Sequence, residues 1–559
     1  MSKTEDRIIF VSGGVVSGIG KGTITSSLAL LIKARGFTVS PIKCDMYINV
    51  DAGTMNPTEH GEIFVTEDGV ETDQDIGTYE RFLNQPLRKE NYTTTGQVYQ
   101  TVIQRERQLK YEGRCVEVVP DIPEEIIGRI LEASKGVEFT FVELGGTVGE
   151  YQTVLFLEAT RILAKRLPGR TVHIHVSHFP YLKSLGELKS KPTQLSIRKL
   201  NESGIVPDFV VARSEKTVDA PRFNTLCQNS NLTPDEVIFC PDVDEIYKIP
   251  LMLEEQKFPD KVLMKLGLGV VPRPHLDNWI NRLDRLKNLE APTLRIGIIE
   301  KYRNVGEYTL SDTHISVLEA IKHASIEAEC NYEINWINSE KLNQENLDTE
   351  IGKQHGIIVP QAWGARGSEG KIHAIRYARL NKIPFLGLCY GMQMAVVEFG
   401  MTIGLDNANS TEIDPKTPHP VIHIMPEQEE IIRTEQFGGT IRLGSYPCIL
   451  TENSKLAKIY KKNEIKERHR HRYEFNNKYR QEFEKKGMIF SGLSPDSKLV
   501  EAIEIPDHPF FIGVQFHPEF QSSFEKPHPL FLEFLRKAKE SLETEKEETI
   551  KIVKKENND

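Results

Sequence analysis

The feature that most constrains the fold is a short apolar run that ends in a glycine-rich turn near the N-terminus. Ile8-Ile9-Phe10-Val11 leads into glycines and one lysine between Ser12 and Thr23, and apolar residues then recur with helical spacing at Ile24, Leu28, Leu31 and Ile32. This pattern predicts a strand, a loop and a helix. Further apolar runs at 139–144, 172–176 and 208–212 alternate with helical stretches such as 151–167. The alternation predicts an α/β fold with a mostly parallel sheet.

The glycine-rich turn has the chemistry of a phosphate-binding loop. Glycines let backbone N–H groups close on phosphate oxygens, the following helix N-terminus adds a partial positive charge, and Lys21 adds a full one. The strict Walker pattern is not met, because five residues separate Gly14 from Gly20 and Lys21 precedes Gly22. We therefore predict a variant phosphate loop, and the alternative is a glycine-rich turn that binds no ligand.

Two carboxylates are candidates for the divalent cation that phosphoryl chemistry needs. Glu143 closes an apolar strand and is followed by two glycines. Burying such a group unpaired would cost several kcal/mol, so packing does not explain it. Asp75, in Glu71-Thr72-Asp73-Gln74-Asp75, is equally consistent with a solvated acidic loop.

A second centre is predicted around Cys389, in Pro384-Phe385-Leu386-Gly387-Leu388-Cys389-Tyr390-Gly391. Small neighbours on both sides permit a sharp strand-to-helix turn, and the helix N-terminus favours a thiolate and offers a backbone N–H to an oxyanion. Gly513–Phe520 supplies a base, since Pro518 biases His517 toward extended backbone, from which Glu519 can orient the imidazole. The alternative is a buried, inert cysteine.

The length of 559 residues predicts two or more domains. An amphipathic segment at 272–292 precedes a second β-start at 294–299, with further strand candidates at 356–359 and 384–388. We expect a first α/β domain at 1–276, a linker helix at 277–293, a second α/β domain at 294–537, and a charged, disordered tail at 538–559.

Composition narrows the function further. A net charge of −10 gives no electrostatic footprint for nucleic acid. Seven cysteines without paired spacing argue for a reducing compartment and against disulfides or zinc. No apolar run approaches about 18 residues and the N-terminus lacks a signal-peptide pattern, so we expect a cytoplasmic enzyme with no membrane contact.

Taken together, the motifs resemble the CTP synthase family over nearly the whole length apart from the charged tail. The segments that carry the resemblance are Gly13–Lys21, Tyr47–Asp51, His60–Val65, Gly69–Asp75, Tyr79–Phe82, Glu143–Gly149, Lys189–Gln194, Asn409–Glu412 and Arg468–Glu474. The resemblance implies a two-domain α/β amidoligase fused to a class I glutaminase. Such an enzyme phosphorylates O4 of UTP with Mg-ATP, and ammonia from glutamine then displaces the phosphate to give CTP.

The resemblance also assigns roles to residues by matching motif. ATP would be bound by Ser17, Gly18, Ile19, Gly20, Lys21, Gly22, Asp75 and Arg213, and Mg²⁺ by Asp75 and Glu143. UTP or CTP would be bound by Ser17, Lys43, Glu150, Tyr151, Gln152, Lys189, Ser190, Lys191, Pro192, Thr193, Gln194 and Arg222. Glutamine would be held by Ala362, Trp363, Gln393, Glu412 and Arg472, with catalysis by Cys389, His517 and Glu519 and an oxyanion hole at Gln361 and Tyr390. Arg366, Gly367 and Glu369 would form a lid that responds to GTP as activator, and His60 would line the ammonia passage. CTP as feedback inhibitor and a homotetramer are further implications.

The most consequential departure from the family lies in Pro360-Gln361-Ala362-Trp363-Gly364, where Pro-Gly-Gly-Phe-Gly is usual. Glycines adopt positive φ freely, whereas Gln or Ala do so at a cost of roughly 1–2 kcal/mol each. Losing one oxyanion donor typically costs about 10²–10³ in turnover. We therefore expect reduced glutaminase efficiency with an intact synthase, and a synthase that depends on free ammonia is the main alternative.

Smaller departures lie near the pyrimidine nucleotide. Glu150 and Gln152 stand where Asp and Glu are usual, Arg222 where a Lys is expected, and Met46 and Ala52 replace prolines. Two further alternatives are an amidoligase that acts on a carboxylate, against which Lys189–Gln194 argues, and a catalytically silent nucleotide-binding filament protein. Retention of Cys389, His517, Glu519, Lys21 and Glu143 argues against the latter.

Overall fold

The computed structural model describes residues 6–269, 271–272, 276–286, 290–302, 304–305, 308–309, 312–425, 428–433 and 438–556. The chain forms two compact units, one of residues 1–52 and 75–278 and the other of residues 53–74 and 279–559. The linker and domain bounds expected from the sequence remain predictions. The inclusion of 53–74 in the second unit was not predicted from the sequence.

The first unit is built on a parallel seven-stranded sheet in the order β11-β10-β7-β1-β6-β2-β5. Its strands are β1 (Arg7–Gly14), β2 (Val39–Asp45), β5 (Tyr92–Thr94), β6 (Phe139–Leu144), β7 (Thr171–His178), β10 (Phe209–Ser214) and β11 (Val237–Pro241), and β8 (Tyr181–Leu182) pairs with β9 (Glu187–Leu188) separately. The strands predicted at 139–144, 172–176 and 208–212 are confirmed as β6, β7 and β10. The predicted parallel α/β fold is confirmed.

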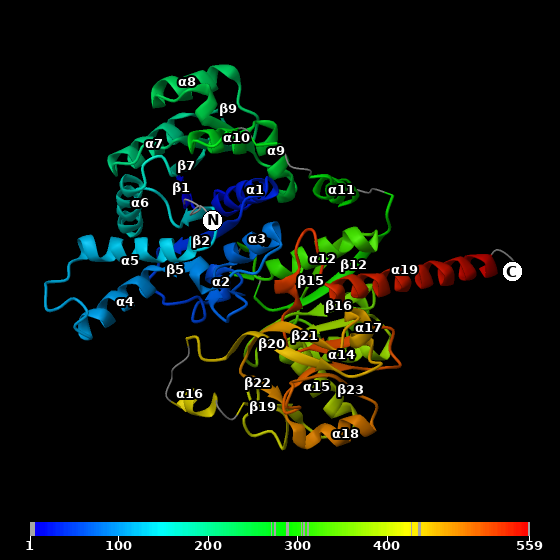
Figure 1. Cartoon of the computed structure of the whole chain (residues 1–559). Helices are drawn as coiled ribbons and strands as arrows, with labels where there is room; N and C mark the ends of the chain where they lie inside the picture. Colours follow the sequence, from blue (N-terminus) through cyan, green and yellow to red (C-terminus); the bar gives the residue numbers. More distant parts are fainter. Residues whose placement is uncertain are drawn as a thin grey trace. The chain divides into compact units, whose positions relative to one another are not determined.

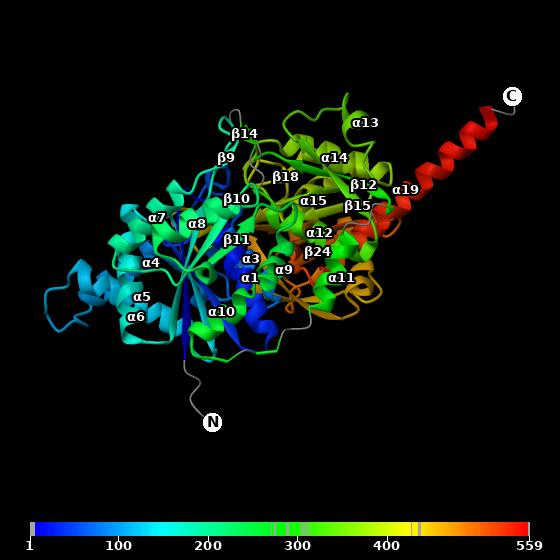
Figure 2. The same cartoon turned by 90° about the horizontal axis from the view of Figure 1, so that it is seen from above.

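Helices cover both faces of this sheet (Figure 2). The helices are α1 (Lys21–Ala34), α3 (Gln74–Leu83), α4 (Thr95–Arg107), α5 (Val118–Ala133), α6 (Val154–Arg166), α7 (Lys191–Glu202), α8 (Ala220–Ser230), α9 (Ile249–Glu255) and α10 (Phe258–Lys265), with short 3-10 turns at η1 (Lys89–Asn91), η2 (Tyr151–Thr153), η3 (Pro234–Glu236) and η4 (Ile246–Lys248). Ile8 and Phe10 pack with α4, α5 and α6 in one apolar core. Because side chains alternate along a strand, Ile9 and Val11 face the other side of the sheet, where α1 lies.

The second unit has a nine-stranded mixed sheet in the order β15-β12-β16-β17-β25-β24-β23-β20-β21. The strands are β12 (Thr293–Glu300), β15 (Asn331–Asn338), β16 (Gly356–Val359), β17 (Phe385–Leu388), β20 (Arg442–Leu450), β21 (Glu464–His471), β23 (Ile489–Leu493), β24 (Val500–Glu504) and β25 (Phe511–Val514). Those from β15 to β25 are parallel and those from β25 to β21 antiparallel. Smaller pairings join β18 (Ala408–Ser410), β19 (His419–Ile424) and β22 (Tyr473–Phe475), then β13 (Asn304–Val305) with β14 (Tyr308–Thr309).

Two apolar cores sandwich this sheet between helical layers. One core contains α12 (Ile315–Ala328), α17 (Lys455–Tyr460) and α19 (Pro529–Glu556), and the other contains α14 (Ser368–Leu380), α15 (Tyr390–Thr402) and α18 (Arg480–Lys485). The remaining helices are α2 (Pro57–His60), α11 (Asp277–Leu286), α13 (Leu347–Glu350) and α16 (Glu429–Arg433), with η6 (Asn477–Tyr479) and η7 (Pro518–Gln521). Helix α11 lies within the segment 277–293, for which a linker helix is predicted, and the ring centroids of Trp279 and Phe524 are 4.5 Å apart.

The prediction of a disordered tail from residue 538 is wrong for the described residues, because α19 continues to Glu556 as one helix (Figure 1). Ala538 and Leu542 are still buried against the sheet. The Glu545 carboxylate then accepts hydrogen bonds from Arg295, at 3.1 Å, and from His355, at 2.9 Å. Up to residue 546, the charged side chains of this segment therefore lie on the solvated side of a helix.

Residues 53–74 form a segment that is joined to the second unit by buried contacts. Within it, β3 (Phe64–Val65) pairs with β4 (Glu71–Thr72). The Glu71 carboxylate accepts a hydrogen bond from Arg470 Nε at 2.8 Å, and both side chains are buried. Glu62 accepts a hydrogen bond from the Ser316 backbone N–H at 3.0 Å. A stretch that the sequence assigns to the first domain thus packs around the strand that carries Arg470.

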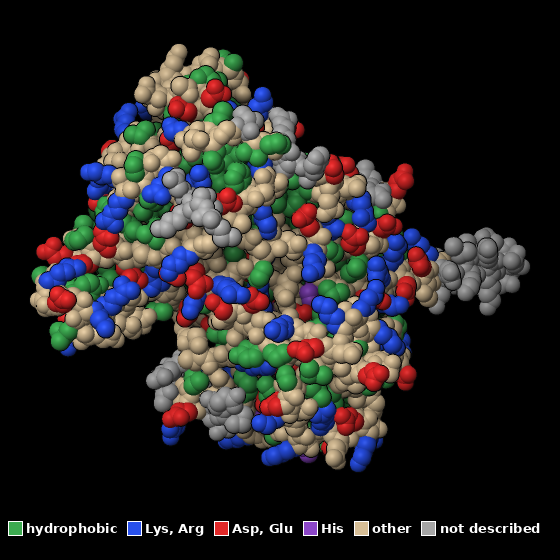
Figure 3. Space-filling model, viewed as in Figure 1, with side chains coloured by type: hydrophobic (Ala, Val, Ile, Leu, Met, Phe, Trp, Pro, Cys, Tyr) green, Lys and Arg blue, Asp and Glu red, His purple; other side chains and the backbone are tan. Residues whose placement is uncertain are grey.

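None of the helices in the described part of the chain has both the length and the apolar character that a bilayer crossing requires. On the face of the molecule in Figure 3, basic and acidic side chains are interspersed.

Candidate functional site

The predicted phosphate loop joins β1 to α1. Gly18 and Gly20 adopt positive φ of 69° and 88°, which other residues adopt only with strain. The Lys21 ammonium donates to the Gly146 carbonyl at 2.8 Å, and burial lowers the pKa of Lys21. Arg213 lies beside this loop, since a Cβ added at Gly20 would be 3.6 Å from its Nε. The structure therefore brings Lys21 and Arg213 to one glycine-rich turn, with Ser17 exposed at its tip.

A cluster of buried carboxylates adjoins the loop, because β1 pairs in register with β6 and Val11 lies opposite Glu143. Lys43 Nζ is 3.0 Å from Glu143 and 3.8 Å from Asp45, and it also contacts Asp75. Tyr79 donates to the other Glu143 oxygen. Burial raises the pKa of Glu143. The structure thus brings Asp75 to Glu143, which the sequence alone left open.

This cluster fits a divalent cation. Its donors are carboxylate oxygens, which Mg²⁺ prefers, and they already surround a positive charge, the Lys43 ammonium. Gly22 leaves the necessary room, since a Cβ there would be 2.6 Å from Asp75 Oδ1.

The residues predicted to hold the pyrimidine nucleotide fall into two groups. In the first group, Glu187 links two predicted residues, because its carboxylate contacts Lys189 and accepts a hydrogen bond from Arg222 at 2.7 Å. Thr193 in the same motif donates to the His178 carbonyl at 2.8 Å. The other group, Glu150 to Gln152, is on the surface, and Tyr151 is 95% exposed. An apolar ring so exposed has room for a ligand or a partner.

The sharp strand-to-helix turn predicted at Cys389 is present in the structure, and it is called the elbow below. Cys389 adopts φ 50° and ψ −100° between β17 and α15, and its backbone N–H donates to the Val514 carbonyl at 2.7 Å. Gly391 permits the turn, because a Cβ there would be 2.0 Å from the Val359 carbonyl oxygen. The side chain of Cys389 is buried, with Sγ 3.6 Å from the Arg470 carbonyl.

The predicted base and its orienting carboxylate are also in contact. His517 Nδ1 is 2.7 Å from Glu519 Oε1, and both side chains are buried. Burial alone would lower the pKa of His517, but Glu519 and Cys389 together raise it to about 10. The backbone is not extended through Glu519 as predicted, because η7 begins at Pro518 and the carboxylate reaches back within that turn. The imidazole stacks on Phe520, with ring centroids 5.0 Å apart.

The loop that departs from the family pattern is not strained where the sequence predicted strain. Positive φ occurs at Gly364 and Gly367, and neither Gln361 nor Ala362 adopts it. The expectation of a positive-φ cost at these two residues is therefore wrong. The two positions of this loop that adopt positive φ, 364 and 367, are both glycine.

The residues predicted to hold glutamine gather around the elbow. Gln393 Nε2 donates to the Tyr473 carbonyl at 3.0 Å and to Gln515 Oε1 at 3.3 Å. Glu412 accepts from the Gly364 N–H at 2.7 Å. Burial raises the pKa of Glu412, while that N–H, Lys301 and Arg472 act in the opposite direction. A carboxylate and a guanidinium within one electrostatic neighbourhood suit the two charged ends of an amino acid.

Sequence reasoning missed three residues beside this centre. Gln515 is fully buried and its Nε2 donates to Cys389 Sγ at 3.5 Å. Lys301 and Tyr302 contact the 361–367 loop, where Tyr302 OH accepts from the Trp363 N–H at 2.9 Å. The position of Gln515 two residues before His517 was an available signal, because such residues share one side of an extended strand.

His469, His471 and Glu501 lie close enough together to hold a metal ion. The guanidinium of Arg442 already lies among these three side chains, since it pairs with Glu501 at 2.7 Å and lies 3.4 Å from a nitrogen of each histidine. Arg442 therefore supplies the positive charge that a metal ion would bring to this cluster.

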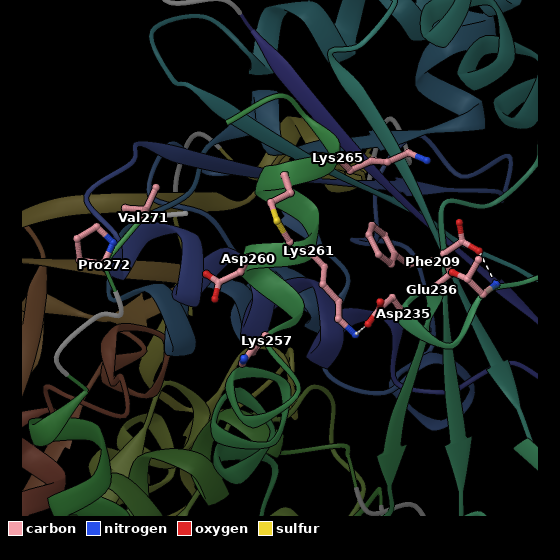
Figure 4. A pocket seen from close by; sticks show the side chains of 11 residues that line it. Phe209, Asp235, Glu236, Lys257, Asp260, Lys261, Lys265, Val271 and Pro272 are labelled. Atoms are coloured by element: carbon pink, nitrogen blue, oxygen red, sulfur yellow. Dashed lines mark hydrogen bonds and ion pairs between the residues drawn. The ribbon is translucent and has the colours of Figure 1, made fainter. Parts of the chain in front are cut away.

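A cavity of about 780 Å³ in the first unit is lined by α10 together with Phe209 and Asp235 (Figure 4). Lys261 points toward Asp235 and pairs with it at 3.1 Å. Acidic and basic groups here neutralise one another, and the cavity shares no residue with either predicted centre.

Comparison with known proteins agrees with both units. A family model described as CTP synthase N-terminus matches residues 7–268, and one described as glutamine amidotransferase class-I matches residues 309–537. These two matches define the chain as a ligase that forms a C–N bond and hydrolyses glutamine.

Individual relatives narrow the class to one family. A CTP synthase of Caldanaerobacter subterraneus is 46% identical over 95% of this chain and 98% of its own length. A CTP synthase of Pelotomaculum thermopropionicum is 47% identical over 96% and 99%. A solved Trypanosoma brucei CTPS glutaminase domain with bound acivicin is 35% identical, covers 44% of this chain and 94% of its own, and has a TM-score of 0.41. The chain belongs to the CTP synthase family, whose members convert UTP to CTP with glutamine in an ATP-dependent reaction.

Proposed function

We propose that the glutaminase of this chain is fully competent and that the departure at Gln361-Ala362 is tolerated. The observation that carries the proposal is the contact between His517 and Glu519 beside an elbow at Cys389 with positive φ. The proposal is also supported by the backbone of Gln361 and Ala362, neither of which adopts the positive φ that the expected loss of efficiency assumed.

In the proposed glutaminase reaction, the Cys389 thiolate attacks the amide carbon of glutamine. His517 delivers a proton to the amide nitrogen, ammonia leaves, and a thioester remains on Cys389. Water, deprotonated by His517, then attacks the thioester, so that glutamate leaves and the thiol is restored. Backbone N–H groups of Gln361 and Tyr390 stabilise the oxyanion in both steps. Ala362, Trp363, Gln393, Glu412 and Arg472 hold the substrate, of which Glu412 suits the ammonium and Arg472 the carboxylate.

In the proposed synthase reaction, the loop from Ser17 to Gly22 and Arg213 hold the ATP phosphates. O4 of UTP attacks the γ-phosphorus and ADP leaves; ammonia then attacks C4 and inorganic phosphate leaves, which gives CTP. Mg²⁺ held by Asp75 and Glu143 would neutralise phosphate charge when bound. Lys21 and Lys43 are close enough to those carboxylates to add positive charge to the same phosphates.

We assign UTP, and CTP as feedback inhibitor, to a pocket that combines two sets of residues. The triphosphate would meet Lys43, Ser17, Arg222 and the 189–194 motif, where Lys189 and Arg222 are already brought together by Glu187. The base and ribose would meet Glu150, Tyr151 and Gln152. Exposure of Tyr151 supports a site that a second copy of the chain completes.

Three regulatory features complete the proposal. GTP would activate the glutaminase at Arg366, Gly367 and Glu369, and His60 would line the route of ammonia. A homotetramer is supported by exposed apolar side chains on α4, α5 and α6, namely Ile103, Val118 and Val154, and by Leu109, which follows α4. We place the enzyme in the cytoplasm because the seven cysteines are all unpaired.

The test is CTP formation at saturating UTP, Mg-ATP and GTP, once with glutamine and once with ammonium chloride at high pH. Comparable turnover with both donors, and loss of the glutamine reaction alone in Cys389→Ala, supports the proposal. Turnover with ammonia only would instead favour a defective oxyanion loop. Turnover with neither would favour a silent nucleotide-binding protein.

A further inference from the structure

We propose that Lys301 is a positioning residue that holds the 361–367 loop in the shape needed for oxyanion stabilisation. The inference rests on the proposed role of the Gln361 N–H, and it explains how this chain keeps that loop in place with Gln-Ala instead of Gly-Gly.

Three backbone carbonyl groups of the 361–367 loop point toward the ammonium of Lys301. Lys301 Nζ donates to the carbonyl of Trp363 at 2.5 Å, to that of Gly364 at 3.1 Å and to that of Arg366 at 2.8 Å. A lysine ammonium has three N–H donors and no acceptor, so these three carbonyls use its full donor capacity. The side chain is buried, with 4% of its surface exposed.

Three carbonyl oxygens that point at one place repel one another unless a cation lies between them. Hydrogen bonds in which the donor is charged are roughly twice as strong as neutral ones, and burial strengthens them further. Without the ammonium, the Trp363, Gly364 and Arg366 peptide groups have no common partner on this side. The loop would then reorient, and the residues just before Trp363 would move with it.

Other contacts fix the opposite side of the same peptides. The Trp363 N–H donates to Tyr302 OH and the Gly364 N–H to Glu412, at 2.9 and 2.7 Å. Tyr390 OH donates to the Gly364 carbonyl at 2.9 Å. Because Tyr390 also supplies the second proposed oxyanion N–H, the loop that Lys301 holds is tied to the residue on the other side of the oxyanion hole.

Charge at Lys301 is sensitive to pH within an accessible range. Burial and the neighbouring Arg366 lower the pKa of Lys301 to about 8, while Glu412 and Glu340 oppose this. The other titratable groups near Lys301 are Tyr302, Tyr390 and Lys371, of which burial lowers the pKa of Lys371 to about 7. A neutral amine has one N–H fewer and a lone pair, so it cannot serve three carbonyls. Glutaminase activity should therefore fall as pH rises through about 8.

The experiment compares Lys301→Met and Lys301→Arg in the full-length enzyme. Lys371→Met is the matched control, because Lys371 is a fully buried lysine that donates to the carbonyl of Ile299 on β12 rather than to the loop. Glutamate release, CTP formation from ammonia and alkylation of Cys389 by a glutamine-like chloroketone are measured for each variant.

Lys301→Met is expected to lower kcat for glutamate release by about 10²–10³-fold, the usual loss for one oxyanion donor, with CTP formation from ammonia within about 2-fold of wild type. Lys371→Met should retain glutamate release. Unchanged kcat in a folded Lys301→Met variant would overturn the inference.

If Lys301→Met also loses the ammonia reaction, it is misfolded and the pH profiles decide. Wild-type glutamate release should decline above about pH 8, and Lys301→Arg, which stays charged, should lack that decline. A wild-type profile that is flat to about pH 9.5 would overturn the inference. A wild-type enzyme that makes CTP from ammonia and never releases glutamate would refute the proposed glutaminase, and this inference with it.

Discussion

Replacing Gly391 by alanine tests whether the turn at Cys389 requires the backbone at Gly391 to lie close to the backbone at Val359. The added Cβ would lie 2.0 Å from the Val359 carbonyl oxygen and 3.0 Å from its carbon, both main-chain atoms. Since ordinary contacts need more than 3 Å, the first turn of α15 would have to move by about 1 Å. A misplacement of that size at a reacting group costs about 10²-fold in rate, or roughly 2.7 kcal/mol.

The assay is glutamate release by Gly391→Ala, with CTP formation from ammonia as the measure of folding. Gly400→Ala is the matched control on the same helix, because its Cβ would meet side chains and no backbone atom, at 3.1 Å from Ala408 Cβ, 3.3 Å from Phe483 Cζ and 3.5 Å from Val421 Cγ1, and alanine favours a helix interior. We expect about 10²-fold loss of glutamate release in Gly391→Ala and near-normal release in Gly400→Ala. Release within about 3-fold of wild type in Gly391→Ala would refute the argument.

Three further predictions concern side chains of the two centres. Glu519→Gln should lower glutamate release by about 10²–10⁴-fold, the range known for an orienting carboxylate. The pKa of His517 is raised to about 10, so the ion pair of protonated His517 with Glu519 contributes its full share to the free energy of unfolding below about pH 6.5. That contribution is lost as pH rises toward 10. The thermal midpoint of Glu519→Gln should therefore approach that of wild type at high pH, and a difference that stays constant with pH would contradict this. Gln515→Met removes a donor to Cys389 Sγ and should lower glutamate release about 10–30-fold, with Gln354→Met, also buried, as control; equal losses in both variants would count against a specific role. Glu143→Gln should abolish CTP formation from either nitrogen donor while Cys389 remains open to alkylation, and retained synthesis from ammonia would exclude Glu143 from the synthase centre.

Local pattern was sufficient to predict the β-loop-α unit and the elbow. Candidate functional residues were expected where parallel strands end. The signals were the strand Ile8–Val11 before a glycine-rich turn, and Leu388–Cys389 before Gly391. These segments carry their own geometry, because glycine spacing and apolar periodicity are properties of a few consecutive residues.

Contacts between distant segments could not be predicted in this way. The Glu71 to Arg470 ion pair and the convergence of three carbonyls on Lys301 depend on tertiary packing, which no window of sequence displays. The cost assigned to Gln361 was wrong because φ at a given residue follows from the whole loop. The tail was mispredicted because one buried stripe, including Leu542, is enough to hold a charged helix against a sheet.

The most direct test of the central claim traces the glutamine nitrogen. The enzyme is supplied with glutamine labelled with ¹⁵N at the side-chain amide, unlabelled ammonium, UTP and Mg-ATP, and the exocyclic amine of CTP is examined by mass spectrometry. We predict ¹⁵N in the CTP made by wild type and only unlabelled CTP from Cys389→Ala. Unlabelled CTP from wild type would contradict the account, because the two centres would then not share their nitrogen.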